Sequence, residues 1–315
     1  MEQLTDLKAI LHSKRANIYY LEKCRVMQKD GRVLYLTEAK DENYYWNIPI
    51  ANTTVILLGT GTSITQAAMR MLASAGVLVG FSSGGGAPLL MGNEVEWMTP
   101  QSEYRPTEYI QGWMKFWFDD TKRLLAARQF QHARLDYLQS VWSKDRDLKA
   151  EGFLVSDTAI GAAINKFKTQ IDQTQKVGDL LQLEAQLTKV LYRYAAQMTK
   201  HGEFVREREA TDVANGFLNH GNYLAYGLAA TTLWVLGINH GFAVMHGKTR
   251  RGALVFDVAD LIKDALILPW AFIFAKEKST EQEFRQLCLQ KFTEHKALDY
   301  MFDNVKDVAL RGHTL

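Results

Sequence analysis

Residues 107–142 read TEYIQGWMKFWFDDTKRLLAARQFQHARLDYLQSVW, and this stretch decides the fold class of most of the chain. Its aromatic and aliphatic side chains recur every three or four residues between charged ones, which is the period of an amphipathic α-helix. Of the five prolines, only Pro269 comes after the stretch begins. Because proline is disfavoured inside helices, residues 107–315 are predicted to form an all-helical domain.

The segment before this stretch, MTPQSEYRP at residues 98–106, separates two sequence patterns. Its two prolines and polar neighbours belong to neither a helix nor a strand. The pattern upstream is β-rich. The sequence therefore predicts an N-terminal β-rich domain at residues 1–98, a linker at 99–106 and the helical domain at 107–315.

Turn and strand signals organise the N-terminal domain. Residues 16–36 hold two β-rich runs joined at Asp30-Gly31, a dipeptide that supplies the positive φ of a tight hairpin. A single helix is expected to begin at Ser63, capped by its hydroxyl, and to end before Gly76. This pattern predicts a β-sandwich-like domain with one helix, whose further strands are expected at residues 44–48, 53–58 and 77–81.

Composition excludes several classes of protein. With 47% hydrophobic and 23% charged residues, the chain has enough apolar material for packed domains, and a disordered chain is excluded. Lys plus Arg number 37 and Asp plus Glu number 35, so the chain is not a polycation. The small surplus of basic over acidic residues lies in residues 99–315. Because this surplus is small, any affinity for DNA would have to come from local clusters of basic residues.

The sequence indicates a cytoplasmic protein. Its two cysteines, Cys24 and Cys288, are too far apart for a CxxC motif and suggest no disulfide framework. The N-terminus has no apolar run of the signal-peptide type. The most apolar window, residues 223–238, is shorter than the roughly 20 residues that a membrane helix requires. We expect a buried core helix there and no membrane partner.

A Gly-x-Gly turn at Gly59 and Gly61 invites a dinucleotide-binding interpretation, because it lies between a predicted strand and a predicted helix. The third small position is Ile64, whose branched side chain hinders close helix–strand packing, and the next acidic residue is Glu94. We therefore expect an ordinary strand, turn and helix, with no organic cofactor site.

Acidic residues in the helical domain suggest chemistry. Glu184 lies at the margin of an apolar stripe, where a salt bridge to Lys189 or Arg193 is the simpler interpretation. Asp257 and Asp260 share one helix face by their spacing of three. Together with His246 they form a candidate Mg²⁺ or Mn²⁺ site, since these ions prefer mostly oxygen ligands.

Two interpretations of these acids stay open from spacing alone. In the first, Asp257 and Asp260 form a solvated face paired with Lys263 and Arg250. In the second, they hold a metal ion inside a groove for a polyanion, which the surrounding basic residues favour. The candidate DNA-binding residues are Lys189, Arg193, Lys248, Arg250, Arg251 and Lys263.

Long stretches of the chain resemble one known family, the CRISPR-associated spacer-acquisition integrases of the first-numbered Cas protein, and most resemble its subtype I-F branch. These stretches are HSKRANIYYLEKCRV, NIPIANTTVILLGTGTSITQAAMRMLASAGVLVGF, TPQSEYRPTEYIQ, HGNYLAYGLAA, and HGKTRRGALVFDVADLIKD followed by ILPWAF. The resemblance implies the same division into a β-rich and a helical domain.

The resemblance also implies roles for particular residues. Glu184, His246 and Asp260 match the family's metal ligands, and Asp257 matches an aspartate that is needed for activity without necessarily being a ligand. Lys189 and Tyr192 fill two further family positions.

The implied activity is a metal-dependent DNA integrase and endonuclease that joins 3′ hydroxyls of short spacer-precursor DNA to repeat phosphodiesters. The implied partners are DNA, a second copy bound through the β-rich domain, and the second-numbered Cas protein fused to a helicase-nuclease. The alternative is a non-catalytic DNA-binding scaffold in which the acids are structural pairs.

Overall fold

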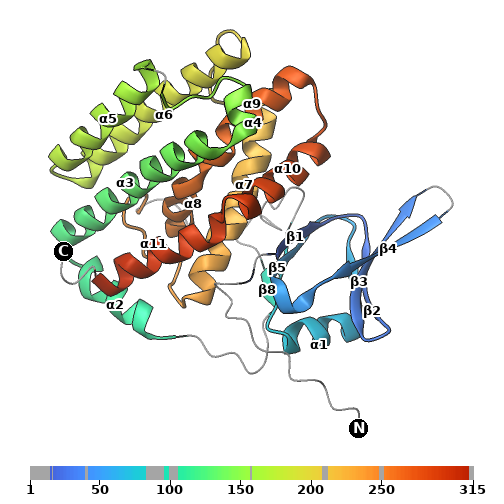
Figure 1. The fold of residues 1–315 in the computed structure, drawn as a ribbon. Helices are drawn as coiled ribbons and strands as arrows, with labels where there is room; N and C mark the ends of the chain where they lie inside the picture. Colours follow the sequence, from blue (N-terminus) through green and yellow to red (C-terminus); the bar gives the residue numbers. More distant parts are fainter. Residues whose placement is uncertain are drawn as a thin grey trace. The chain divides into compact units, whose positions relative to one another are not determined.

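A computed structural model describes residues 15, 17–39, 42–82, 96–98, 106–156, 158–207, 212–247 and 252–311 (Figure 1). The chain divides into two compact units, Met1–Arg105 and Pro106–Leu315. Strands form two sheets in the first unit and helices make up the second, so the predicted combination of a β-rich part and an all-helical part is confirmed.

The first unit contains two four-stranded sheets. One has the order β1-β5-β7-β8, with β1, β5 and β7 parallel and β8 antiparallel to β7; the other has the order β4-β3-β2-β6. The bounds in the first sheet are β1 Asn17–Leu21, β5 Thr53–Leu58, β7 Leu78–Phe81 and β8 Glu96–Met98. Those in the second are β2 Arg25–Lys29, β3 Arg32–Ala39, β4 Glu42–Ile48 and β6 Ser63–Ile64.

The predicted hairpin is present between β2 and β3. Lys29 pairs with Arg32, which leaves Asp30 and Gly31 as the two loop residues. Their φ angles are 51° and 70°, the positive values that a two-residue turn matching the strand twist requires. The β-rich stretch before this hairpin forms two strands rather than one, because the chain breaks at Lys23, φ 49°, and enters the other sheet.

The helix of this unit, α1, begins later than its sequence predicts. Residues Ser63 and Ile64 form β6, parallel to β2, and α1 spans Gln66–Ser74. Thr65, not Ser63, caps the helix: its side-chain oxygen accepts a hydrogen bond from the Ala68 amide at 3.3 Å. Buried side chains of α1 join those of both sheets in one core, including Ala68, Leu72, Val26, Ile56 and Val79.

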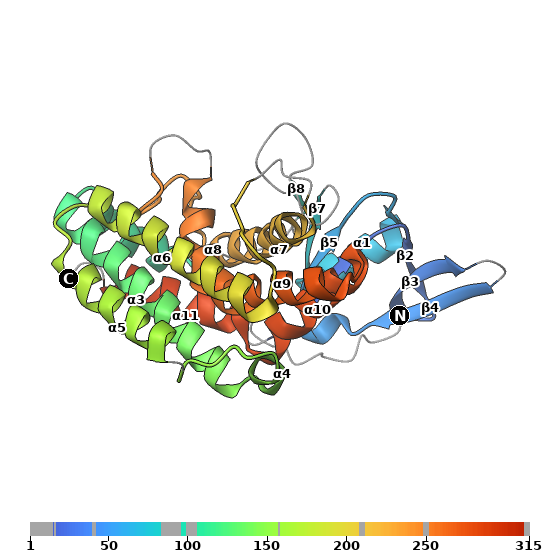
Figure 2. The ribbon, with the colours of Figure 1, turned by 90° about the horizontal axis from the view of Figure 1, so that it is seen from above.

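The second unit is a helical bundle (Figures 1 and 2). Helices α3, α5 and α6 lie side by side, and α8 packs against α3, α7, α9 and α11. The bounds are α2 Glu108–Trp117, α3 Asp120–Lys144, α4 Arg146–Ala150, α5 Thr158–Gln173, α6 Val177–Thr199, α7 Val213–Val235, α8 Ala253–Leu266, α9 Leu268–Glu277, α10 Glu281–Glu294 and α11 Ala297–Arg311.

Two sequence features have structural explanations here. Pro269 lies in the first turn of α9, where a missing amide hydrogen breaks no helical bond. The most apolar window falls mainly on α7, a largely buried helix. Among the helices that the structure describes, none combines the length and apolar character that a membrane crossing needs.

Candidate active site

The central helix α8 carries three buried aspartates. Eleven of its fourteen residues are buried, among them Asp257, Asp260 and Asp264, whose exposed fractions are 3%, 5% and 6%. Spacings of three and four residues place the three carboxylates along one face of the helix. Burying three like charges this close is unfavourable unless cations or hydrogen-bond donors compensate them.

Asp257 is compensated by the segment that carries His246. Its Oδ2 accepts hydrogen bonds from the amides of Val244 at 2.8 Å and Met245 at 3.1 Å. Its Oδ1 accepts one from the His246 amide at 3.1 Å and lies 2.6 Å from His246 Nδ1. Both carboxylate oxygens of Asp257 are therefore engaged, and their contact with Nδ1 fixes the orientation of the imidazole. This leaves Nε2 as the nitrogen of His246 that can bind a ligand.

Glu184, on α6, is compensated by Arg134 of α3. Arg134 Nη1 donates to Glu184 Oε1 at 3.0 Å, and the same oxygen accepts a 3.2 Å hydrogen bond from Thr188. The predicted salt bridge of Glu184 to Lys189 or Arg193 is wrong, because the partner comes from another helix. The guanidinium also donates to Asp264 Oδ2 at 2.5 Å, so one buried cation joins α3, α6 and α8.

Asp260 is compensated within its own helix. Its Oδ1 forms an ion pair with Lys263, whose ammonium lies 5.3 Å from the centre of the Tyr226 ring. Asp260 and Lys263 are thus paired, as the solvated-face interpretation expected. However, Asp260 is buried, so the pair lies inside the bundle and not on a solvated surface.

The charges of this centre act on one another. Burial lowers the pKa of His246, but the hydrogen bond to Asp257 and the negative charges of Asp260, Asp257 and Glu184 outweigh it and raise the pKa above its usual value. Burial raises the pKa of Asp260, while Lys263, Arg134 and His246 together lower it below its usual value. His246, Asp260 and Glu184 therefore form one electrostatic unit.

The donor atoms of this unit suit a divalent cation. Among the described residues, no hydrogen bond engages Glu184 Oε2, Asp260 Oδ2 or His246 Nε2, which leaves two carboxylate oxygens and one imidazole nitrogen. That set fits Mg²⁺ or Mn²⁺. In the structure these three atoms do not all lie within 4.8 Å of one another.

Arg134 and Asp264 also belong to the centre, although neither is among the candidate residues predicted from the sequence. Arg134 is 3% exposed and is flanked on the buried face of α3 by Phe130 and Leu138. An arginine within an apolar helix face is the signal that could have identified it. A small cavity of about 50 Å³ adjoins it, lined by Arg134, Glu184, Thr188, Tyr192, Leu218, Asn222, Asp260, Lys263, Asp264 and Leu268.

The predicted DNA-binding residues fall into three groups. Lys189 and Arg193 are exposed, and at about 100° per residue they lie on the far side of α6 from Glu184. Lys263 is paired with Asp260. Lys248, Arg250 and Arg251 lie outside the described residues.

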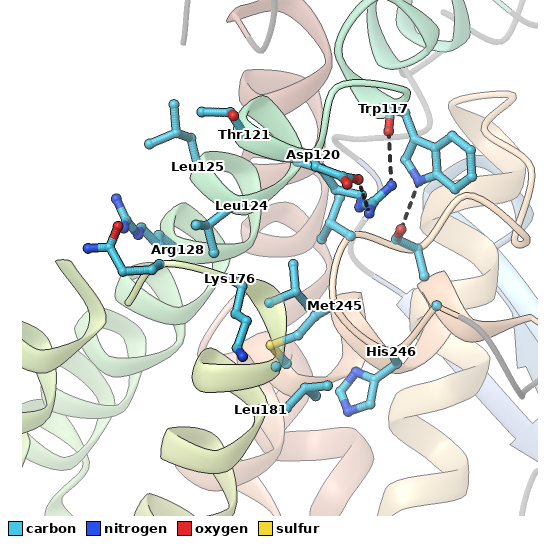
Figure 3. Close-up of a pocket in the computed structure, with 17 residues that line it drawn as sticks. Trp117, Asp120, Thr121, Leu124, Leu125, Arg128, Lys176, Leu181, Met245 and His246 are labelled. Atoms are coloured by element: carbon cyan, nitrogen blue, oxygen red, sulfur yellow. Dashed lines mark hydrogen bonds and ion pairs between the residues drawn. The ribbon is translucent and has the colours of Figure 1, made fainter. Parts of the chain in front are cut away.

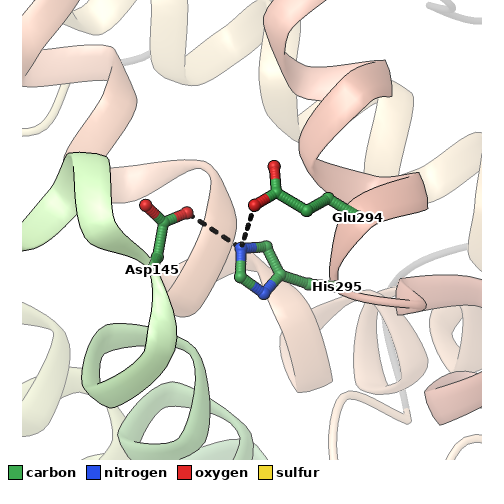
Figure 4. Close-up of side chains that lie close together, drawn as sticks. All are labelled: Asp145, Glu294 and His295. Atoms are coloured by element: carbon green, nitrogen blue, oxygen red, sulfur yellow. Dashed lines mark hydrogen bonds and ion pairs between the residues drawn. The ribbon is translucent and has the colours of Figure 1, made fainter.

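A second polar cluster joins α10 to the start of α4 (Figure 4). Asp145, Glu294 and His295 are the group in the described part of the chain whose possible ligand atoms come within 4.8 Å of one another. The ammonium of Lys291, 1% exposed, lies 2.9 Å from Asp145 and 3.1 Å from Glu294. This lysine already supplies the cation, so the cluster is a structural ion-pair network.

A much larger cavity, of about 920 Å³, opens beside His246 (Figure 3). It is lined by the corner between α2 and α3, by the first turn of α6, and by residues 243–247. Trp117 is fixed at this corner because its indole nitrogen donates to the Ala243 carbonyl at 2.7 Å. The cavity and the aspartate centre share His246.

Comparison with known proteins gives consistent matches. Residues 18–296 match the family described as CRISPR associated protein Cas1. The chain is 59% identical to the CRISPR-associated endonuclease Cas1 of Pseudomonas aeruginosa, covering 98% of this chain and 97% of that protein. It is 55% identical to the protein of the same name from Pectobacterium atrosepticum, with coverages of 97% and 95%.

Two solved structures share the fold. The protein of a TtCas1-DNA complex has a TM-score of 0.63 at 20% identity, with 92% of this chain and 90% of that chain covered. A casposase bound to integration product has a TM-score of 0.66 at 12% identity, with coverages of 95% and 91%.

Proposed function

The chain belongs to the CRISPR-associated Cas1 family, and on this premise we propose that it is a metal-dependent DNA integrase and endonuclease of CRISPR adaptation. Its reaction would join the 3′ hydroxyl of a short spacer-precursor DNA to a phosphodiester of the repeat. Support comes from two relatives named endonucleases and from a fold neighbour bound to an integration product.

The observation that carries this proposal is the arrangement around His246. Asp257 holds Nδ1 at 2.6 Å, and Asp260 and Glu184 contribute negative charge to the same group. A carboxylate behind an imidazole is the usual support of a metal-ligating or proton-transferring histidine. The residues that would hold the ion are Glu184, His246 and Asp260. When bound, Mg²⁺ or Mn²⁺ would withdraw charge from the attacked phosphodiester.

The protein's own side chains would supply the rest of the chemistry. One phosphorus–oxygen bond forms to the attacking 3′ oxygen as another breaks, and the departing oxygen takes up a proton. Because His246 Nε2 would be occupied by the ion, that proton would come from solvent, and the role of His246 would be to hold the ion in place. Arg134 and Lys263 hold the acids in place and limit the negative charge that the DNA phosphate meets.

We also propose the predicted partners. The 1–98 segment would form the homodimer, and DNA would bind through exposed basic residues such as Lys189 and Arg193 together with Lys248, Arg250 and Arg251. The second-numbered Cas protein, fused to the helicase-nuclease, would complete the assembly. These assignments extend the family resemblance to this chain.

The test is strand transfer by the purified full chain on branched DNA with and without Mn²⁺. We expect metal-dependent cleavage and joining, and we expect Glu184→Ala and Asp260→Ala to abolish both while DNA affinity stays within a few-fold of the parent. Full activity in either variant would overturn the assignment. Tight DNA binding without any metal-dependent product would favour the alternative, a non-catalytic DNA scaffold.

A further inference from the structure

Helix α7 carries three asparagines, and one of them lacks the hydrogen bonds that the other two make. Asn215 Oδ1 accepts a hydrogen bond from Arg206 Nη1 at 2.8 Å, and Asn219 Oδ1 accepts one from Arg206 Nη2 at 2.7 Å. Among the residues that the structure describes, none is hydrogen-bonded to the carboxamide of Asn222. Asn222 is half-buried, and an amide that leaves water without a partner costs free energy. Its position in the helix therefore points to a role other than stability.

Asn222 faces the acid centre. It lines the cavity of about 50 Å³ together with Leu218, which lies four positions earlier and therefore on the same face of α7. Four positions later on this face, the ring of Tyr226 has its centre 5.3 Å from the ammonium of Lys263. The face of α7 that carries Asn222 is thus directed at the part of α8 that carries Asp260 and Lys263.

The cavity brings this carboxamide to two of the proposed ion ligands. Glu184 and Asp260 line the same cavity, and each has one carboxylate oxygen that no hydrogen bond engages within the described part of the chain. The volume of about 50 Å³ exceeds the roughly 10–15 Å³ that a single water needs. The cavity can therefore hold a water that is bound to an ion.

The charges around the cavity favour a neutral ligand on α7. Three carboxylates, of Glu184, Asp260 and Asp264, line it together with two cations, Arg134 and Lys263. A fourth carboxylate would add to the repulsion among the acids in the metal-free protein. An amide oxygen adds no charge and is a ligand that hard divalent cations accept.

We propose that Asn222 is a further ligand residue of the divalent ion, with its Oδ1 bound to the ion directly or through one water. This inference rests on the proposed function, since it takes Glu184 and Asp260 as ion ligands. The ion then satisfies the carboxamide, which is unpaired in the metal-free chain. Asn222 is accordingly a residue that lowers stability for the sake of function.

Two substitutions of Asn222 test the proposal, with Mn²⁺ affinity of the metal-free full chain measured by isothermal titration calorimetry. Asn222→Leu keeps the size of the side chain and removes the oxygen, and we expect it to weaken Mn²⁺ binding by roughly tenfold, the usual scale for a group that supports a metal site. Asn222→Asp should tighten binding, because affinity for a divalent cation rises with the number of carboxylate ligands. Unchanged affinity in Asn222→Leu would overturn the proposal.

Asn219→Leu is the matched control. It makes the same change three positions earlier on α7, at a carboxamide that is bonded to Arg206 and lies outside the cavity lining. We expect it to lower the melting temperature and to leave the dissociation constant of Mn²⁺ within about twofold of the parent, because it removes a structural hydrogen bond only. An equal loss of Mn²⁺ affinity in both variants would contradict a specific role of Asn222.

Melting temperature without metal separates a ligand from a structural residue. We expect Asn222→Leu to melt no lower than the parent, because it replaces an unpartnered amide with an apolar group in a helix. A structural role of Asn222 would instead lower the melting temperature and leave Mn²⁺ affinity unchanged, which would overturn the proposal.

The inference and the proposed function fail separately when Glu184→Gln is titrated beside these variants. Weakened Mn²⁺ binding in Glu184→Gln but not in Asn222→Leu would keep the proposed metal site and refute the assignment of Asn222. Weakened binding in Asn222→Leu but not in Glu184→Gln would keep Asn222 as an ion-binding residue and refute the proposed ligand set. If Asn222→Leu lowers strand transfer with unchanged Mn²⁺ affinity, the amide contacts DNA and the ligand assignment is refuted.

Discussion

His246 Nδ1 lies 2.6 Å from Asp257 Oδ1, and the same carboxylate accepts backbone hydrogen bonds from three consecutive residues that end at His246. One side chain therefore sets both the position of the backbone and the rotation of the imidazole. Because Asp257 is only 3% exposed and is bonded to His246, we expect it to act through His246 rather than on the substrate, as a positioning residue.

Asp257→Asn tests this role. The amide keeps the size of the carboxyl group but replaces one acceptor with a donor, so His246 loses its orientation. We expect strand transfer to fall by roughly 10–100-fold, the usual loss for a residue that orients a metal ligand. We expect the free energy of unfolding to fall by about 1–3 kcal/mol from the unpaired amides. Unchanged activity with reduced stability would assign Asp257 a structural role only.

Binding of Mn²⁺ should stabilise the protein through the acid centre. At a hundredfold excess over its dissociation constant, an ion that binds only the folded state adds about 2.7 kcal/mol. We expect a higher melting temperature with Mn²⁺ and none of that increase in Glu184→Gln or Asp260→Asn. Glu277→Gln, an exposed acid at the end of α9, is the control and should keep the full shift. If Mn²⁺ still raised the melting temperature of Glu184→Gln by the full amount, the ion would have to bind at another site.

Arg134 should be among the least replaceable residues of the helical unit. Replacing it with methionine leaves Glu184 and Asp264 without their shared cation, and breaking a buried pair in this way costs about 3–5 kcal/mol. Urea unfolding measures this loss. Adding Asp264→Leu to Arg134→Met should recover part of it, because the second change removes the uncompensated carboxylate. Strict additivity of the two losses would mean that the ion pair contributes nothing.

The sequence predicts those features that local chemistry controls. Asp30-Gly31 specifies its turn through positive φ, and residues 53–58 form β5 as predicted. Ser63 is not the helix cap that its local sequence predicts, because its partner in the sheet, Arg25, lies 38 positions away and only the folded chain brings them together. Pairing with β2 in the sheet therefore outweighs the local preference of Ser63 for a helix N-terminus.

The candidate site shows the same limit. The spacing of Asp257 and Asp260 predicts one helix face, and the structure agrees. The sequence does not predict the ion pairs of Arg134, because Glu184 and Asp264 lie 50 and 130 positions further along the chain and no local pattern links them to it. The partner predicted for Glu184 is wrong for the same reason.

The Asp145 cluster should make stability depend on pH in the acid range. Burial alone would raise the pKa of Asp145. The hydrogen bonds from the Leu148 amide, Lys291 and His295 outweigh burial, so the pKa of Asp145 in the folded protein lies below its usual value. The stabilisation is then fully present above the unfolded pKa of about 3.9 and is lost as pH falls through the folded pKa. We expect the stability difference between the parent and Asp145→Asn to be constant near neutral pH and to shrink below about pH 4. A difference independent of pH down to acid unfolding would contradict this assignment.

The proposed dimerisation through the β-rich unit can be tested at β4, an edge strand of its sheet. Tyr44 and Trp46 are 45% and 51% exposed and, two positions apart, lie on one face of the strand. Exposed aromatic side chains on a free strand edge favour association with another chain. The double change Tyr44→Ser and Trp46→Ser should therefore convert a dimer to a monomer in light scattering, while the helical unit, which carries the candidate active site, keeps its fold. Phe118→Ser, at an aromatic of the helical unit that is 70% exposed, is the control and should leave the dimer intact. A dimer that survives the double change but dissociates with Phe118→Ser would place the interface on the helical unit instead.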